Sequence, residues 1–198
     1  MNPATDRGNL KSPAEKKGTI EHRDFKDKDF LFDQVRRCKE GKTESMEHLY
    51  HAYKIPVMNL AYRFTGDSCL AEDLLQDIFI KVFVNIKKLR SPEAFNSWLY
   101  RIAVNTCMSF ARKRGKSREL PFEDIEDAGS AEDVGKNIRR QLEQAVNILP
   151  PRQKAVFHLH DVQGFTHREI AGIMGCSAGT AKSQLFKARM KIRNFLKD

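Results

Sequence analysis

The residues best suited to contact another molecule lie near the C-terminus, in the segment THREIAGIMGCSAGTAKSQLFKAR. If this segment is helical from residue 178 on, one face of that helix carries donors and an aromatic ring, namely Lys182, Ser183, Phe186 and Lys187. Two further polar residues flank this face, Gln184 and Arg189. Lysine pairs with guanine acceptors or phosphate, serine serves either partner, and an aromatic ring contacts a thymine methyl group. The pattern predicts a DNA-reading surface, against the alternative that the ring packs inside the protein and the lysines are merely solvated.

Two short helices are expected to position these side chains. Thr166 and Glu169 have the spacing of a capping box, which starts the first helix. Gly175 is placed to end that helix in a left-handed conformation, and Ser177 to cap the next. The opposite face of the second helix is apolar and should be buried, through Ala181, Leu185, Ala188, Ile192 and Phe195. This is the plan of a helix-turn-helix, whose second helix enters the DNA major groove.

A second candidate surface lies on the helix expected over residues 69–88. Its core stripe leaves the opposite face to four residues, Asp73, Asp77, Ile80 and Val84. A solvated face does not need two aliphatic side chains, so the pattern favours a docking surface for another protein. Burial in a larger helical domain, or chance surface aliphatics, is the alternative.

The next helix is expected to begin at Ser91 and Pro92 and to run to about Arg114. It interleaves aromatic, basic and amide side chains, including Trp98, Tyr100, Arg101 and Asn105. Such a pattern is typical of single-stranded nucleic-acid binding, by base stacking and phosphate pairing. Trp98 is also a good core anchor, and that interpretation is favoured for this residue.

The spacing of the cysteine, histidine and glycine residues disfavours a metal site and enzyme chemistry. The four cysteines form no CxxC pair, and they fit small buried residues of a reduced compartment better than zinc ligands. His158 and His160 are two apart on a helix and so face different directions from each other, and His167 is the only other histidine nearby. No glycine-rich phosphate loop is present. We therefore expect no enzyme activity, no metal and no cofactor.

Composition limits the class of protein. The chain has 198 residues, of which 40% are hydrophobic and 31% charged, with a net charge of +9. No apolar run approaches the length of a membrane span, and the N-terminus lacks a secretory signal, so we expect a cytoplasmic protein without membrane insertion. Basic residues prevail in 91–120 and 151–198 but acids prevail between them. Two basic segments suggest two contacts with a polyanion, most plausibly nucleic acid, and the alternative is a basic surface that only keeps the protein soluble.

The pattern along the chain predicts an all-α protein with two small helical domains. Residues 1–27 are polar and are expected to form a disordered extension. The first helical domain is expected over 28–115 and the second, with the helix-turn-helix, over 138–198. Residues 116–137 are acidic and interrupted by Pro121, Gly129 and Gly135, which predicts a flexible linker.

Three stretches in this order, AEDLLQDIFIKVF, FNSWLYRIAVNTC and LPPRQKAVFHLHDVQGFTHREIAGIMGCSAGTAKSQLFKAR, resemble the extracytoplasmic-function (ECF) sigma factors of bacteria. The resemblance covers about residues 29–196. It implies two helical domains that bind core RNA polymerase and direct it to particular promoters. It also implies that the helix matching DLLQDIF docks on the clamp of the largest polymerase subunit, through Asp73, Gln76, Asp77 and Ile80.

The resemblance further implies two promoter contacts. The loop KKLRSPEAF and the following helix would open the minus-ten element and hold a flipped base, with a pocket lined by Leu89, Arg90, Ser91, Ile102 and Asn105. Arg112 and Lys113 would grip backbone phosphate. The helix-turn-helix would bind the minus-thirty-five element as duplex, through Lys182, Ser183, Gln184, Phe186, Lys187 and Arg189. Many relatives carry arginine at the positions of Lys182 and Lys187, so promoter preference is expected to differ.

The resemblance implies one more partner, an anti-sigma factor that wraps both domains and holds the protein inactive. A stand-alone helix-turn-helix regulator is the alternative function. The N-terminal half distinguishes the two, because a simple regulator needs neither a polymerase-docking helix nor a melting loop.

Overall fold

The computed structural model describes residues 28–116 and 134–197, and within them every regular element is a helix. An N-terminal unit contains α1 (Lys28–Lys39), α2 (Thr43–Thr65), α3 (Ser68–Asn85) and α4 (Phe95–Lys116), with the short turns η2 (Ile86–Lys88) and η3 (Pro92–Ala94) between the last two. A C-terminal unit contains α5 (Val134–Asn147), α6 (Pro151–Phe157), the π-helical turn η4 (His158–Val162), α7 (His167–Met174) and α8 (Ala178–Phe195). The all-α prediction is confirmed.

The N-terminal unit packs its helices around large apolar side chains. Leu49 and Leu60 of α2, Ile78 of α3, and Phe95 and Leu99 of α4 are fully or almost fully buried. The connection between α2 and α3 is fixed locally: Gly66 ends α2 in a left-handed conformation with φ 68°, and the Asp67 side chain accepts the backbone N–H of Leu70.

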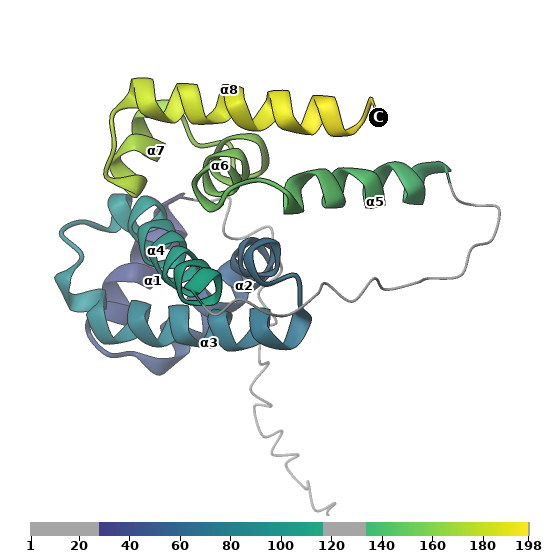
Figure 1. Cartoon of the computed structure of the whole chain (residues 1–198). Helices are drawn as coiled ribbons and strands as arrows, with labels where there is room; N and C mark the ends of the chain where they lie inside the picture. The colour runs from purple at the N-terminus through teal and green to yellow at the C-terminus, as the bar shows by residue number, and fades with distance from the viewer. Residues whose placement is uncertain (1–27, 117–133, 198) are drawn as a thin grey trace, which may run out of the picture.

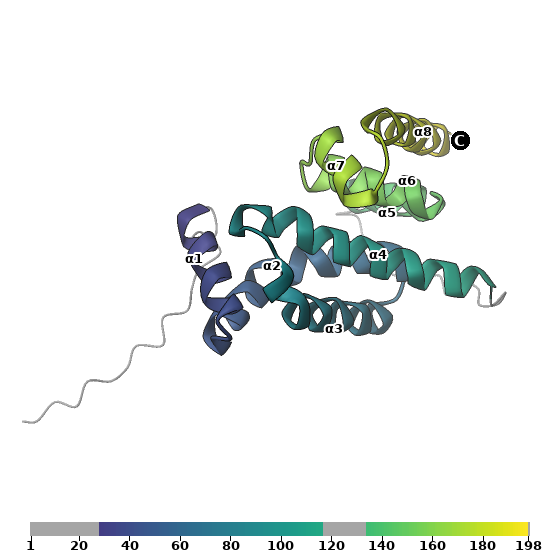
Figure 2. The same ribbon diagram turned by 90° about the vertical axis from the view of Figure 1, so that its left-hand side faces the viewer.

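The two units lie against each other rather than apart. Figure 1 shows α5–α8 above α1–α4, and Figure 2 shows α4 along the boundary between them. One continuous hydrophobic cluster includes core residues of both units, among them Tyr100 of α4, Phe165, and Ile170 of α7. A smaller cluster inside the C-terminal unit joins α5 to α8.

The expected extension 1–27 and most of the expected linker fall outside the described residues. The segment between α4 and α5 is shorter than the expected linker, because α4 continues to Lys116 and α5 already begins at Val134. The helix expected over 69–88 is α3 followed by the turn η2, and the helix expected from Ser91 starts with the turn η3 before α4.

Candidate nucleic-acid interface

The helix-turn-helix of α7 and α8 has the predicted caps. The Thr166 backbone N–H donates to Glu169 Oε2 at 2.8 Å, and the Glu169 N–H donates back to Thr166 Oγ1 at 3.3 Å. The Thr166 hydroxyl also donates to Glu169 Oε2 at 2.7 Å, and this bond, together with the one from the Thr166 backbone N–H, lowers the pKa of Glu169. Gly175 takes φ 63° at the end of α7, and Ser177 Oγ accepts the N–H of Thr180 at 3.0 Å at the start of α8. The turn geometry is thus set by residues within the motif itself.

The outer side of α8, which we call the α8 face, presents Lys182, Ser183, Phe186 and Lys187 to solvent. Phe186 is 65% exposed, so it does not pack on the preceding helix. The opposite side is buried as expected through Ala181, Leu185, Ala188 and Ile192, while Phe195 is only half-buried. An aromatic ring held out between two lysines is an arrangement suited to a base edge or a thymine methyl group.

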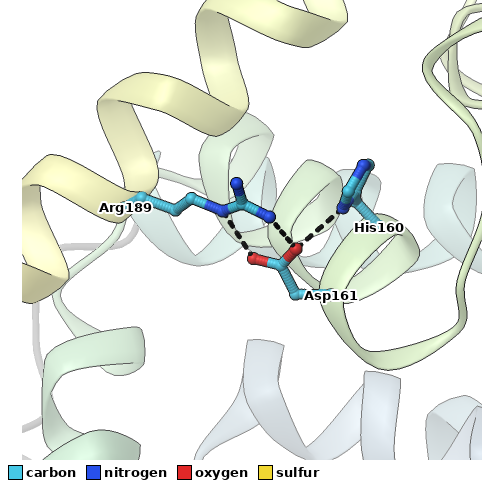
Figure 3. Close-up of polar contacts among 3 residues, drawn as sticks. All are labelled: His160, Asp161 and Arg189. Atoms are coloured by element: carbon cyan, nitrogen blue, oxygen red, sulfur yellow. Dashed lines mark hydrogen bonds and ion pairs between the residues drawn. The ribbon is translucent and has the colours of Figure 1, made fainter.

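Arg189 is also on α8, but its guanidinium is already engaged (Figure 3). Its Nε donates to Asp161 Oδ2 at 3.0 Å and its Nη2 to Asp161 Oδ1 at 2.5 Å, while His160 Nδ1 lies 2.7 Å from the same Oδ1. Burial alone would raise the pKa of Asp161, but the hydrogen bonds from Arg189 and His160 lower it below its usual range. This bidentate pair ties the turn η4 to the middle of α8.

The outer side of α3, which we call the α3 face, is acidic, whereas the α8 face is basic. Asp73, Asp77, Ile80 and Val84 are all exposed, with Ile80 at 60% and Val84 at 74%. Gln76 is exposed beside them. No helix of the described residues covers the two aliphatic side chains, so burial in a larger domain does not account for them.

A third feature is an open cavity of about 420 Å³ on the N-terminal unit. One wall comes from the end of α3 and from η2, through Lys81, Asn85 and Lys88. The other wall comes from α4, through Trp98, Ile102, Asn105, Thr106 and Ser109. Its volume lies in the ~300–1,000 Å³ range of small-ligand sites.

The residues expected to line a base pocket divide into two groups. Ile102 and Asn105 line this cavity. Leu89 has its side chain in the core, 3% exposed, and its carbonyl accepts Lys39 Nζ at 2.8 Å. Arg90 is exposed and Ser91 half-buried on the same loop, outside the cavity lining. Arg112 and Lys113 are exposed near the end of α4, and Arg112 Nη2 donates to Ser109 Oγ at 3.1 Å.

The interface between the units uses a face of α4 that was expected to bind nucleic acid. Tyr100 is buried, packs edge-on against Phe165, and donates its hydroxyl to Gln163 Oε1 at 2.6 Å. Arg101 Nη2 donates to the Gly172 carbonyl of α7 at 2.7 Å. Tyr100 is thus a contact to the C-terminal unit in this structure, whereas Trp98 both packs on the core and lines the cavity.

Two basic side chains, Lys154 and His158, are buried at the same interface. Lys154 donates to the Asn147 carbonyl at 3.1 Å and lies over the ring of Phe64 in α2. Burial, followed by the charge of Arg63, lowers its pKa to about 8. His158 is fully buried, and burial and the same arginine lower its pKa to about 3. His158 is therefore neutral at pH 7.

Other site classes find no support in the described residues. Between 28 and 116 and between 134 and 197, no three His, Cys, Asp or Glu side chains gather as a metal site requires. In the same ranges no helix has the length and apolar character needed to cross a bilayer.

Sequence reasoning missed part of the cavity and all of the interface. Lys81, Asn85 and Lys88 are spaced by four and three residues, which places them on one side of a helix, and that spacing could have identified this wall. The Asp161 partner of Arg189 lies 28 residues away, and the Tyr100–Gln163 and Arg101–Gly172 contacts join residues 63 and 71 apart. No local pattern signals contacts of this range.

Comparison with known proteins extends the sequence observations. Residues 49–117 match the family profile described as Sigma-70 region 2, and residues 139–192 match the profile described as Sigma-70, region 4. The ECF RNA polymerase sigma-E factor of Haemophilus influenzae is 34% identical over 177 residues, which cover 81% of this chain and 92% of the relative. The ECF RNA polymerase sigma factor SigE of Mycolicibacterium smegmatis is 31% identical over 159 residues, covering 77% of this chain but only 62% of the longer relative.

A solved structure agrees with these relatives. The sigma factor RpoE of Bartonella quintana, in complex with the anti-sigma factor NepR, superposes with a TM-score of 0.61 at 25% identity. The match covers 76% of this chain and 98% of that one.

Proposed function

This chain belongs to the ECF RNA polymerase sigma factors, and from that membership we propose which of its surfaces binds the polymerase and which bind the two promoter elements. A sigma factor binds core RNA polymerase and directs it to promoters; the family is not one of enzymes. We assign residues 28–115 to polymerase docking and the minus-ten element, and residues 138–198 to the minus-thirty-five element. The two matching profiles, over 49–117 and 139–192, support this division.

The α3 face is the proposed contact with the clamp of the largest polymerase subunit. Asp73, Gln76 and Asp77 supply polar and negative groups, and Ile80 supplies the apolar centre. The observation in support is the high exposure of Ile80 and Val84 next to two carboxylates. An aliphatic centre with a charged rim has the composition of a protein interface rather than of a nucleic-acid one.

The cavity between α3 and α4 is the proposed pocket for an unstacked base of the minus-ten element. Ile102 and Asn105 line it, and Arg90 and Ser91 belong to the loop beside it. Leu89 contributes by fixing this loop to the core rather than by touching the base. Arg112 and Lys113 lie further along α4, where their exposed charges suit backbone phosphate.

The α8 face is the proposed contact with minus-thirty-five duplex. Lys182, Ser183, Phe186 and Lys187 supply base or phosphate contacts, with Gln184 at their flank. Arg189 is proposed to orient α8 through Asp161, because its guanidinium is already used by that carboxylate. Phosphate contact by Arg189 would require this ion pair to break or to be shared.

The proposal requires the two units to separate on a promoter. The two elements lie about two and a half helical turns apart, roughly 85 Å of duplex. In the closed arrangement Gly172 touches Arg101, and the ten residues from Gly172 to Lys182 can span at most about 36 Å. The cavity and the α8 face are therefore too close to meet both elements at once.

We further propose that an anti-sigma factor regulates the chain and that it acts in the cytoplasm with the polymerase. The support for the first is the likeness to RpoE, which was solved in complex with the anti-sigma factor NepR. Membership of a family that serves RNA polymerase supports the second.

The observation that carries the proposal is that one chain presents two exposed faces of opposite charge, each with apolar side chains at its centre. The test is run-off transcription: core polymerase, with and without this protein, is given a library of bacterial promoters. Transcripts that appear only with the protein are expected. Absence of transcripts, with the chain folded and still binding duplex DNA, would instead favour a stand-alone regulator.

A further inference from the structure

The ion pair between Asp161 and Arg189 neutralises a cation on the side of α8 that is proposed to meet DNA. Lys182, Phe186 and Arg189 are spaced by four and three residues, so they lie in one row along the helix. Arg189 is therefore about 10 Å further along the helix axis than Lys182, on the same side. α8 has no acid of its own but has the cations Lys182, Lys187, Arg189, Lys191 and Arg193.

Arg189 is accessible although it is paired. Its side chain is 53% exposed, whereas that of Asp161 is only 20% exposed. Two of its five guanidinium N–H groups donate to Asp161, from Nε to Oδ2 at 3.0 Å and from Nη2 to Oδ1 at 2.5 Å. The carboxylate thus cancels the charge of Arg189 and occupies the planar fork with which an arginine binds phosphate.

The pair can be broken at low cost on both sides. An ion pair as exposed as this one contributes little to stability, so a protein without the Asp161 charge should still fold. His160 Nδ1 lies 2.7 Å from Asp161 Oδ1, so the carboxylate keeps a hydrogen-bond partner if Arg189 leaves it. Asp161 and a phosphate are therefore direct competitors for the same guanidinium.

The place of Arg189 on α8 suits a phosphate better than a base. The N-terminal half of a recognition helix meets base edges, in a major groove ~12 Å wide that the two backbones border. A cation about 10 Å beyond the start of the reading row lies toward that border. A free arginine at this point would bind the backbone of any sequence.

We propose that Asp161 raises the sequence specificity of this chain by withholding Arg189 from the DNA backbone. The inference rests on the proposed function, which assigns the α8 face to duplex DNA. It adds a residue outside that face that limits the sequence-independent part of binding. Phosphate contacts strengthen binding of all DNA, and a genome offers very many competing sites, so one contact fewer leaves more of the chain free to find promoters.

The experiment measures affinity of the full chain for two duplexes at several salt concentrations. One duplex carries the minus-thirty-five element of a promoter found by run-off transcription, and the other is its scrambled sequence. Asp161→Asn should bind the scrambled duplex about threefold more tightly and steepen the slope of log affinity against log salt by about one. The promoter duplex should gain less, because Asp161 also orients α8, so the ratio of the two affinities falls. Adding Arg189→Gln to Asp161→Asn should restore the wild-type slope.

Replacing single phosphates by uncharged methylphosphonates locates the new contact. Asp161→Asn should lose about threefold in affinity at one phosphate position that the wild type and the double variant tolerate. Asp33→Asn is the matched control, because it releases Arg37 from a similar exposed pair on α1, away from α8. It should change neither the salt slope nor the methylphosphonate pattern.

Three outcomes would overturn the inference and leave the proposed function intact. They are an unchanged slope in Asp161→Asn, a steeper slope that persists when Arg189→Gln is added, and a phosphate contact that the wild type already makes and Arg189→Gln alone removes. If instead the wild type binds both duplexes equally and directs no transcription with core polymerase, the proposed function fails and this inference with it.

Discussion

The α3 face and the α8 face are built alike but carry opposite charge. Each is the outer side of an 18-residue helix whose inner side is buried, and each exposes apolar side chains that a solvated helix does not need. On α3 the aliphatic pair lies beside Asp73 and Asp77, whereas on α8 the ring of Phe186 lies between lysines. Exposed apolar residues indicate a partner on each face, and the sign of the neighbouring charge is the basis for proposing a protein for the acidic face and nucleic acid for the basic one.

The largest expected effect tests the acidic face. Asp77→Arg reverses a charge at the centre of the proposed polymerase contact, and we expect affinity for core polymerase to fall at least about 30-fold, as for the loss of a buried interfacial charge. Duplex binding through the α8 face should be unchanged. Asp33→Arg, an equal change at an exposed position on α1, is the control. Unchanged polymerase affinity for Asp77→Arg would remove the distinction between the faces.

The next effect tests the buried interface between the two units, which neither face includes. The pKa of His158 is about 3 in the packed protein, below its unfolded value near 6.5, so the unfolded chain binds more protons between these pH values. Stability should therefore fall on acidification from about pH 6.5, by about 1.4 kcal/mol per pH unit for this group.

Denaturant unfolding at pH 7.5 and 5.5 measures this loss. His158→Asn, which does not titrate, should lose about 1.4 kcal/mol less than the wild type over that range. Equal losses in the two proteins would show that folding does not lower the pKa of His158.

A smaller effect tests the basic face. Lys187→Ala should weaken promoter duplex binding about fivefold and reduce the slope of log affinity against log salt by about one, since one cation contact is lost. Lys191→Ala, one turn further along α8, should have a smaller effect because it lies away from the N-terminal half of the helix. Titrations at several salt concentrations measure both. A loss of polymerase affinity with Lys187→Ala would mean that the α8 face is wrongly assigned.

The smallest effect separates binding from positioning on α8. Asp161→Asn weakens the pair with Arg189 and should lower the free energy of unfolding by about 0.5–1 kcal/mol at pH 7. Because the folded pKa of Asp161 is lowered, the contribution is complete above about pH 4 and is lost as the pH falls through that lowered value. Arg189→Ala combined with Asp161→Asn should cost little more than either change alone. Additive losses would show that the two residues act separately.

Sequence reasoning succeeded where structure is decided locally. The caps at Thr166 and Ser177 and the left-handed Gly175 depend on neighbours within three or four residues, and the faces of α3 and α8 follow from helical periodicity. All of these are read directly from spacing. The exposure of Ile80, Val84 and Phe186 was predicted in the same way.

It was less complete where distant segments meet. The side of α4 that carries Tyr100 reads as a nucleic-acid surface, and only the packing of the C-terminal unit turns it into an interface. Leu89 was expected in a loop that lines a base pocket, but after the turn η2 its side chain is buried in the core and its carbonyl accepts a hydrogen bond from Lys39. The cavity lined by Lys81 and Lys88 could not be predicted from the sequence, because its other wall is α4 and the packing of α4 against α3 is not a local pattern.

The interface at Tyr100 has a consequence for genetics. If the closed form must open before both promoter elements are reached, the apparent affinity is the intrinsic affinity multiplied by the fraction of chains that are open. Substitutions that loosen the closed form, at Tyr100, Gln163 or Phe165, would then raise activity although these residues belong to neither the α3 face nor the α8 face. A selection for hyperactive alleles is expected to return such positions, and a selection for inactive ones to return the α3 and α8 faces.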